Sequence, residues 1–341
     1  MRYTHTSDVP LALAVFLASD NYDYNEDPDT ISATTLIKPL RQTILSARVP
    51  QSMATTPLPA MMKNRIGSAI HDAIERAWKD NHQAAMLALG YPQRVINRIA
   101  VNPSDQELAD NPNLIPVYME QRLARKLGKW TITGKFDFIG EGRVQDFKST
   151  VVWTYLNQVN NNKYALQGSI YRWLDPKKIT QDEMDIHFIF TDHQASKVKM
   201  DPSYPAYPFK RQVFPLLPLA ETTKFILDKT TGLERYWSAD EEDIPPCNDE
   251  DLWRSDPVFK YYKNPDKANQ PGGRSTKNFT VDDFGSVVGA RQAAHLRLSE
   301  EKGVGIIVEK PGEVMACKYC PAFPVCSQKD KLIAAGELNM G

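Results

Sequence analysis

The feature that most constrains the fold of this chain is a run of alternating apolar and polar residues from Thr133 to Lys148, interrupted by Gly140-Glu141-Gly142. Successive side chains of a strand point to opposite faces, so Phe136 and Phe138 would point to one face and Asp137 to the other. The glycine-flanked centre predicts a tight turn. We therefore expect an antiparallel hairpin with one buried, aromatic face.

The predicted hairpin brings two carboxylates together. If Glu141-Gly142 forms a two-residue loop, the pairing places Asp137 directly opposite Asp146. Two facing carboxylates repel each other. A divalent cation between them makes the arrangement favourable, because hard oxygen ligands are those that Mg²⁺ prefers. Lys148, on the same face as Asp146, could stabilise the charge that grows on a phosphate under attack or orient the water. The alternative is a surface hairpin with ordinary solvated charges.

The segments around the hairpin predict an α/β fold. A helix is expected from about residue 61 to 79, where Ile66, Ile70 and Ile74 lie at helical spacing. One strand is expected over residues 130–139, and a second helix over 163–174, before a strand at 185–190. This order indicates a central sheet flanked by helices. A surface loop over 201–218 and a helix over 219–239 should follow.

We divide the chain of 341 residues into three parts. Residues 1–60 should form an N-terminal segment that packs on the core. Residues 61–240 should form the core itself, and residues 241–341 an appended C-terminal lobe. The hydrophobic fraction of 42% is sufficient for a sizeable core.

Charge and hydropathy restrict the partners and the location. A net charge of −1 indicates no global basic field, although DNA enzymes often confine positive charge to one cleft. The first residues lack the pattern of a signal peptide, and the longest apolar runs, such as residues 9–18, are too short to span a bilayer. We expect a cytoplasmic protein without a membrane partner.

Three of the four cysteines crowd near the C-terminus, as Cys317, Cys320 and Cys326. Cytosolic thiols stay reduced, which argues against disulfides. The CxxC spacing is the chelating turn of zinc and iron–sulfur sites. A fourth ligand is needed, and Cys247 is the only other cysteine. We predict a structural metal or cluster site that ties down the C-terminal lobe.

Three motifs together resemble a known superfamily. Gly134-x-x-Asp137 followed by Asp146-x-Lys148 resembles the core motif of PD-(D/E)XK nucleases, with Asp146 where many members have Glu. The helix element Gly67-Ser68-Ala69-Ile70-His71 is similar to the Gly-x-x-x-His element of the RecB-like exonuclease branch. The element Gln167-Gly168-Ser169-Ile170-Tyr171 is similar to the Gln-x-x-x-Tyr helix of that branch. The likeness covers residues 61 to 195.

The resemblance implies a restriction-endonuclease-like core, a central mixed sheet flanked by helices, and a specific site. It implies that His71, Asp137 and Asp146 bind Mg²⁺ or Mn²⁺. Asp137, Asp146 and Lys148 would carry the chemistry. Gln167 and Tyr171 would support the lysine or touch the DNA backbone. Each flanking element also has an ordinary interpretation. His71 could be a hydrogen-bonded core or surface histidine, and the helix with Gln167 and Tyr171 could simply be amphipathic. Glu75, one turn after His71, either orients it or is a solvated helix charge.

The cysteine spacing resembles the C-terminal CxxCx5C element of iron–sulfur nucleases, including the AddB type and the CRISPR-associated adaptation exonucleases. In those families the fourth cysteine usually lies upstream of the core, whereas Cys247 lies downstream. The resemblance therefore implies a [4Fe–4S] cluster and leaves Zn²⁺ open. The surroundings of Cys247, with Leu252-Trp253, also resemble phage-encoded members. A phage protein would act in the host cytoplasm.

These observations predict a metal-dependent DNA exonuclease. It would hydrolyse phosphodiester bonds from the ends of linear single- or double-stranded DNA in replication, recombination or repair, beside other proteins of those processes. An endonuclease of the same superfamily is the first alternative. The second is a non-catalytic, zinc-stabilised nucleic-acid-binding or assembly protein, in which Phe259-Lys260-Tyr261-Tyr262-Lys263 could bind a strand by stacking and charge. The first interpretation of this stretch is nevertheless an ordinary surface.

Overall fold

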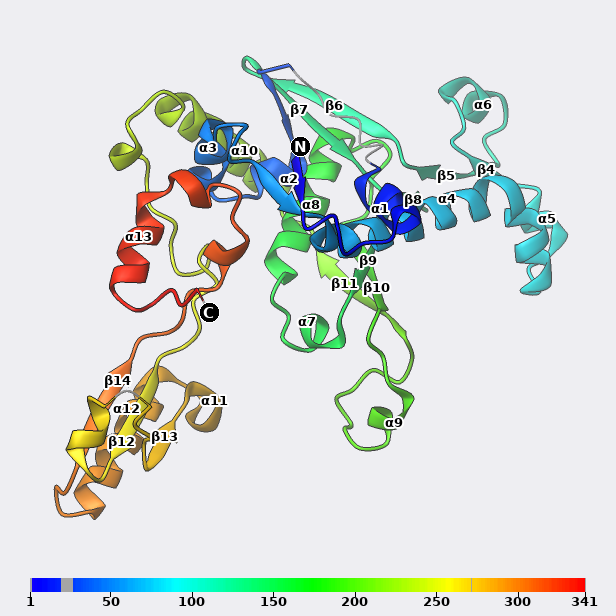
Figure 1. The fold of residues 1–341 in the computed structure, drawn as a ribbon. Helices are drawn as coiled ribbons and strands as arrows, with labels where there is room; N and C mark the ends of the chain where they lie inside the picture. The colour runs from blue at the N-terminus through cyan, green and yellow to red at the C-terminus, as the bar shows by residue number, and fades with distance from the viewer. Residues whose placement is uncertain (1, 20–26, 271, 341) are drawn as a thin grey trace. The chain divides into compact units, whose positions relative to one another are not determined.

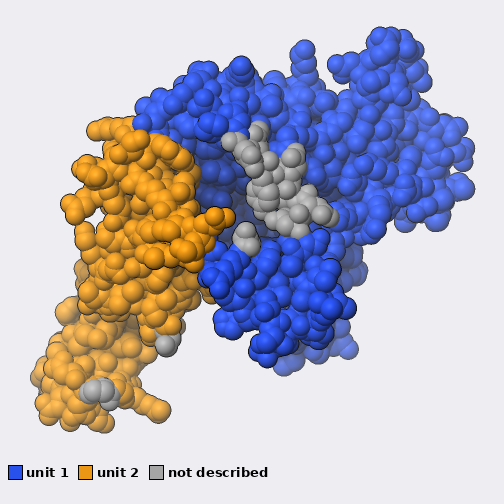
Figure 2. Space-filling model, turned by 45° about the horizontal axis from the view of Figure 1, so that its top comes forward, with its two compact units in different colours: residues 1–38, 54–234 blue, residues 39–53, 235–341 orange. Residues whose placement is uncertain are grey.

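The computed structural model describes residues 2–19, 27–270 and 272–340, and the chain divides into two compact units (Figures 1 and 2). Unit 1 comprises Met1–Lys38 and Ala54–Glu234, and unit 2 comprises Pro39–Met53 and Arg235–Gly341. The expected N-terminal segment 1–60 is therefore divided between them, because residues 39–53 group with the C-terminal part. The change from unit 1 to the C-terminal part of unit 2 falls between Glu234 and Arg235.

The core of unit 1 is a six-stranded mixed sheet in the order β11-β10-β9-β8-β5-β4. Its strands are β4 (Ile99–Val101), β5 (Ile115–Met119), β8 (Phe138–Gly140), β9 (Arg143–Thr150), β10 (Glu183–Phe190) and β11 (Phe209–Pro215). The β9–β10 and β4–β5 pairs are parallel, and the other neighbours are antiparallel. This arrangement confirms the α/β class. Strand β11 lies where we predicted a loop, because the prolines and tyrosines of residues 201–218 obscured its alternation.

A second, three-stranded sheet has the order β2-β7-β6. It consists of β2 (Thr30–Ser32), β6 (Arg122–Leu127) and β7 (Trp130–Lys135), while β1 (Arg2–Thr4) pairs with β3 (Thr55–Pro57). The prediction of one strand over residues 130–139 is wrong. The chain leaves β7 at Phe136, which is fully buried, and bends at Asp137 before β8 joins the larger sheet. This bend places Asp137 at the junction of the two sheets.

The hairpin of β8 and β9 has the predicted register. Gly140 pairs with Arg143 and Phe138 with Gln145, which confirms the two-residue loop. Glu141 and Gly142 both have positive φ, 53° and 75°, as the tight turn of a hairpin with right-handed twist requires. Continued by one step, this register sets Asp137 level with Asp146.

Two helices cover opposite faces of the six-stranded sheet. Trp78 of α4 (Met62–Ala88) packs on Phe138 with 5.0 Å between ring centroids, and Tyr164 of α8 (Asn161–Leu174) packs on Phe188 at 5.9 Å. Helix α4 runs beyond the predicted end at residue 79, because the sequence continues with strong helix formers. Within its expected apolar stripe Ile66 is exposed.

Unit 1 also holds shorter helices. They are α1 (Leu11–Ala18), α2 (Ala33–Leu36), η1 (Leu58–Met61), α5 (Gln93–Ile96), α6 (Asp105–Asp110), α7 (Val152–Leu156) and α9 (Ala195–Val198). The longer α10 (Leu219–Tyr236) agrees with the predicted helix over 219–239, and its last two residues already belong to unit 2. Among the helices of the described residues, none combines the length and apolarity that crossing a membrane requires.

Unit 2 contains two hydrophobic clusters and α3 (Leu40–Arg48). A three-stranded sheet, β13-β12-β14, packs against α12 (Figure 1). The elements are η2 (Glu241–Asp243), β12 (Val258–Tyr262), η3 (Pro265–Ala268), β13 (Lys277–Phe279), α11 (Val281–Phe284), α12 (Val287–Glu300), β14 (Ile306–Lys310), η4 (Ala316–Tyr319), η5 (Phe323–Val325) and α13 (Ser327–Ala334). Phe259, Tyr261 and Tyr262 are buried there. The hypothesis that they stack on a nucleic-acid strand is therefore wrong.

Gly134 of β7 lies where a side chain cannot fit. A Cβ there would stand 2.8 Å from atoms of both Tyr171 and Leu174 on α8. We expect Gly134→Ala to lower the free energy of unfolding by about 1–3 kcal/mol, the usual effect of overpacking. Urea unfolding would measure this difference. An unchanged transition midpoint would contradict the close packing of α8 on β7.

Candidate active site

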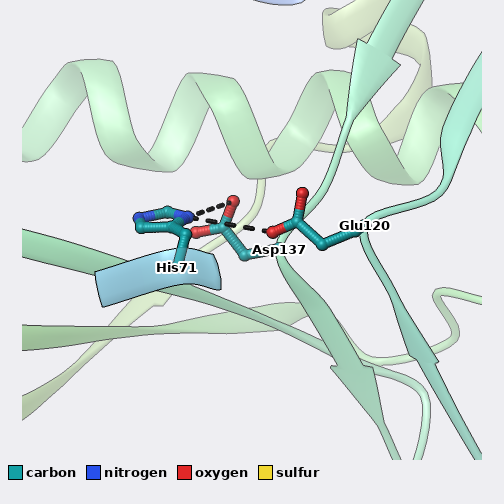
Figure 3. A group of neighbouring side chains, drawn as sticks. All are labelled: His71, Glu120 and Asp137. Carbon is teal, nitrogen blue, oxygen red and sulfur yellow. Dashed lines mark ion pairs between the residues drawn. The ribbon is translucent and has the colours of Figure 1, made fainter. Parts of the chain in front are cut away.

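His71 of α4 is held against the hairpin by a main-chain group. Its Nε2 lies 2.9 Å from the carbonyl oxygen of Phe147 in β9. A carbonyl can only accept, so Nε2 carries the proton and Nδ1 faces the other way. There Nδ1 lies 3.4 Å from Asp137 Oδ1 and 3.9 Å from Glu120 Oε1 (Figure 3). One helix thus aims a ring nitrogen at two carboxylates.

Asp137 and Glu120 are fixed by the strands beside them. Asp137 Oδ2 accepts a hydrogen bond of 3.0 Å from Phe147 N, and Glu120 N donates to the Asp137 carbonyl at 3.2 Å. Glu120 directly follows β5 and has a φ of 52°. The three potential ligand atoms of His71, Glu120 and Asp137 all lie within 4.8 Å of one another.

Sequence reasoning missed Glu120. Its position depends on the pairing of β5 with β8, in which Met119 stands opposite Phe138. That pairing joins segments separated by another hairpin, so no local pattern reveals it. The available local signal was a carboxylate directly after the apolar residues Val117, Tyr118 and Met119.

A positive imidazole and Lys135 together balance the two carboxylates, since Lys135 Nζ lies 2.5 Å from Glu120 Oε2. Burial lowers the pKa of His71, but its contacts with Asp137 and Glu120 outweigh burial and raise the pKa to about 10. Burial also raises the pKa of Asp137, yet His71 and Lys148 bring it below the usual value. A divalent cation could take the place of the imidazolium proton, because metal binding and proton release are linked.

Asp146 and Lys148 form a separate pair on the same strand. Lys148 Nζ lies 2.5 Å from Asp146 Oδ2, and the Asp146 side chain is 1% exposed. Burial raises the pKa of Asp146 to about 6, although Lys148 opposes this shift. Apart from this ion pair, Asp146 Oδ2 has no hydrogen-bond partner among the described residues. Asp146 therefore neutralises Lys148 and is not part of the three-residue group around His71.

Gln167 and Tyr171 lie one turn apart on α8 and are joined by a hydrogen bond. Gln167 Nε2 donates to Tyr171 Oη at 2.8 Å, and this hydroxyl donates to the Lys135 carbonyl at 2.9 Å.

Glu75 does not turn toward His71; it forms an ion pair of 2.6 Å with Lys79. This ion pair agrees with the interpretation of Glu75 as a solvated helix charge rather than as a partner that orients His71.

A cavity of about 1040 Å³ in unit 1 unites these residues. Its lining includes all six residues that the sequence motifs singled out in the core, namely His71, Asp137, Asp146, Lys148, Gln167 and Tyr171. Glu120 and three cationic side chains, Arg65, Arg122 and Lys135, also line it. The cavity therefore carries an acidic centre with positive charge around it.

The four cysteines form a second candidate site, in unit 2. All are free and partly buried, and Cys247 and Cys317 pack against a cluster that includes Leu252 and Val314. Burial, the charge of Asp251 and the thiolate charges of the three other cysteines raise the pKa of Cys247 to about 12. These surroundings therefore disfavour a free thiolate at Cys247.

Comparisons with known proteins give distant structural likenesses. No protein-family model and no curated protein match the sequence. The crystal structure of SSO0001 is similar to 61% of this chain over 78% of its own, with 14% identity and a TM-score of 0.37. A phage-related exonuclease from Haemophilus somnus 129PT is similar to 39% of this chain over 64% of its own, with 14% identity and a TM-score of 0.24. Likenesses this distant define neither the fold nor the activity.

The three-residue group makes a prediction about Glu120. Glu120→Gln keeps the shape of the side chain but removes a charged oxygen ligand. Loss of groups that only orient ligands costs about 10–100-fold in metal affinity, so we expect Mn²⁺ to bind at least about 10-fold more weakly. Calorimetric titration with Mn²⁺ would measure it.

Glu75→Gln is the matched control, since Glu75 is a glutamate near His71 that pairs with Lys79 instead. Its Mn²⁺ affinity should equal that of the wild type. Equal weakening in both variants would indicate a general charge effect, and no weakening in Glu120→Gln would remove Glu120 from the site.

Proposed function

We propose that this chain is a metal-dependent DNA exonuclease of the RecB-like branch of the PD-(D/E)XK superfamily, with a restriction-endonuclease-like core. The observation that carries the proposal is the convergence of His71, Glu120 and Asp137 in one cavity with the Asp146–Lys148 pair. These residues come from α4, the end of β5, the β7–β8 bend and β9. Ordinary surface charges seldom converge in this way from four separate elements.

The donor set of the first group fits Mg²⁺ or Mn²⁺. Two carboxylates supply hard oxygens, and one imidazole nitrogen faces them with its other nitrogen held by the Phe147 carbonyl. A bound ion of this kind polarises a phosphate and lowers the pKa of a bound water. Asp146 is proposed as a further ligand on the Lys148 side.

The protein's own groups would then orient and stabilise the phosphate. Lys148, held by Asp146, presents an ammonium to the cavity, where it can stabilise charge that develops on the phosphate. Arg122 lines the same cavity and can contact a neighbouring phosphate, whereas Lys135, which also lines it, pairs with Glu120 at 2.5 Å. Gln167 and Tyr171 brace β7 through the Lys135 carbonyl and so fix the wall of the cavity.

We propose that the four cysteines hold a [4Fe–4S] cluster, with Zn²⁺ as the alternative. Burial, Asp251 and the other cysteines raise the pKa of Cys247, and a bound cation would instead favour its thiolate. The CxxC turn of Cys317 and Cys320 suits either centre, and the further five residues to Cys326 resemble the element of iron–sulfur nucleases, which places [4Fe–4S] before Zn²⁺.

The nuclease proposal predicts Mg²⁺- or Mn²⁺-dependent digestion of end-labelled linear DNA that leaves covalently closed circles intact. Lys148→Ala should reduce the rate at least about 100-fold, a typical effect of losing a preorganised charge in a reaction centre. Lys177→Ala, an exposed lysine outside the cavity lining, is the matched control and should digest at the wild-type rate.

Three other outcomes would change the proposal. Cutting of the circle would indicate an endonuclease. Undiminished digestion by Lys148→Ala would separate the activity from this cavity. Absence of metal-dependent cutting on linear, circular and single-stranded DNA would favour the binding or assembly role.

The cysteine centre predicts a different phenotype for Cys320→Ser. We expect loss of bound iron or zinc and a lower thermal midpoint, because a structural metal site contributes directly to folding. Elemental analysis of anaerobically purified protein, with thermal unfolding, would measure both and identify the metal. A variant with wild-type metal content and stability would exclude Cys320 as a ligand.

A further inference from the structure

Arg41, on α3 of unit 2, is a buried cation that contacts one of the cysteines. It is 5% exposed, and its Nε donates toward Cys326 Sγ at 3.5 Å. The two residues stand 285 positions apart in the sequence. A fixed guanidinium beside a sulfur therefore comes from the N-terminal part of the chain.

The two terminal nitrogens of the Arg41 guanidinium are also bound, and their contacts fix the direction of the Nε–H. One terminal nitrogen donates to the carbonyls of Glu241, at 3.1 Å, and Ile244, at 2.9 Å. The other forms an ion pair with the Glu241 carboxylate. Because the guanidinium is planar, these contacts on one edge fix where the Nε–H points.

The same carboxylate also holds the chain next to the cysteine. Glu241 Oε1 accepts hydrogen bonds from Ser327 N at 2.8 Å and from Ser327 Oγ at 2.9 Å. Ser327 directly follows Cys326. The Arg41–Glu241 pair thus fixes Cys326 twice, through its sulfur and through the backbone that follows it.

We propose that Arg41 is a positioning residue of the cysteine centre, which orients Cys326 and offsets the negative charge of the metal-bound thiolates. This inference rests on the proposed cysteine centre. Four thiolates around a cluster or a zinc ion leave net negative charge in a partly buried place, where a fixed cation stabilises it. Hydrogen bonds to the sulfurs also set the properties of such clusters. A purely structural role for the Arg41–Glu241 pair is the competing explanation.

The experiment compares metal retention in full-length variants purified anaerobically. Arg41→Lys keeps the charge but loses the Nε–H. The double variant Arg41→Met with Glu241→Gln removes both charges, so that neither is left buried alone. Arg48→Lys is the matched control, because Arg48 lies on the same helix and donates to the carbonyls of Tyr236 and Trp237.

Iron and zinc per chain and the affinity measured by competition with a chelator are the readouts, beside circular dichroism for folding. We expect both Arg41 variants to bind the metal about 10- to 100-fold more weakly than Arg48→Lys and the wild type. A folded double variant with wild-type affinity would overturn the inference and leave only a structural pair. If the double variant does not fold, a wild-type metal affinity in Arg41→Lys would overturn the inference instead. A wild-type chain without iron or zinc would overturn the cysteine centre itself, and this inference with it.

Discussion

The candidate active site depends on two hydrogen bonds made by the main chain of Phe147 in β9. Its amide donates to Asp137, and its carbonyl accepts from His71. One residue of the hairpin therefore fixes a carboxylate from the preceding strand junction and an imidazole from α4. The backbone does this work, while the phenylalanine ring stacks on His187, at 5.4 Å between centroids, and meets the His71 ring edge-on, at 6.2 Å.

This arrangement divides the charged side chains of the cavity into two groups. In one, His71 contacts Asp137 and Glu120, and Lys135 pairs with the same Glu120; in the other, the ammonium of Lys148 pairs with Asp146. In a buried setting an uncompensated carboxylate is costly, so each charge has a partner without any ion. A cation that replaces the imidazolium proton would still neutralise the carboxylates around His71. A phosphate could then approach the ammonium of Lys148.

The sequence predicted the parts of the site that depend on local geometry. Alternation and a two-residue turn were enough to set Asp137 level with Asp146, because hairpin register follows from the loop. It did not predict that Asp146 would pair with Lys148 alone. It also missed Glu120, whose place depends on β5 joining β8, a contact between distant segments. The break between β7 and β8 escaped prediction for the same reason, since two sheets share one continuous apolar run. Residues 39–53 gave no local sign that they group with the C-terminal unit.

The central claim is that His71, Glu120 and Asp137 hold one divalent ion, and pulsed electron paramagnetic resonance of bound Mn²⁺ tests it most directly. An imidazole ligand couples its nitrogen to the Mn²⁺ electron spin. We predict this nitrogen coupling in the wild-type protein and its loss in His71→Gln. Bound Mn²⁺ without nitrogen coupling, or coupling that persists in His71→Gln, would contradict it.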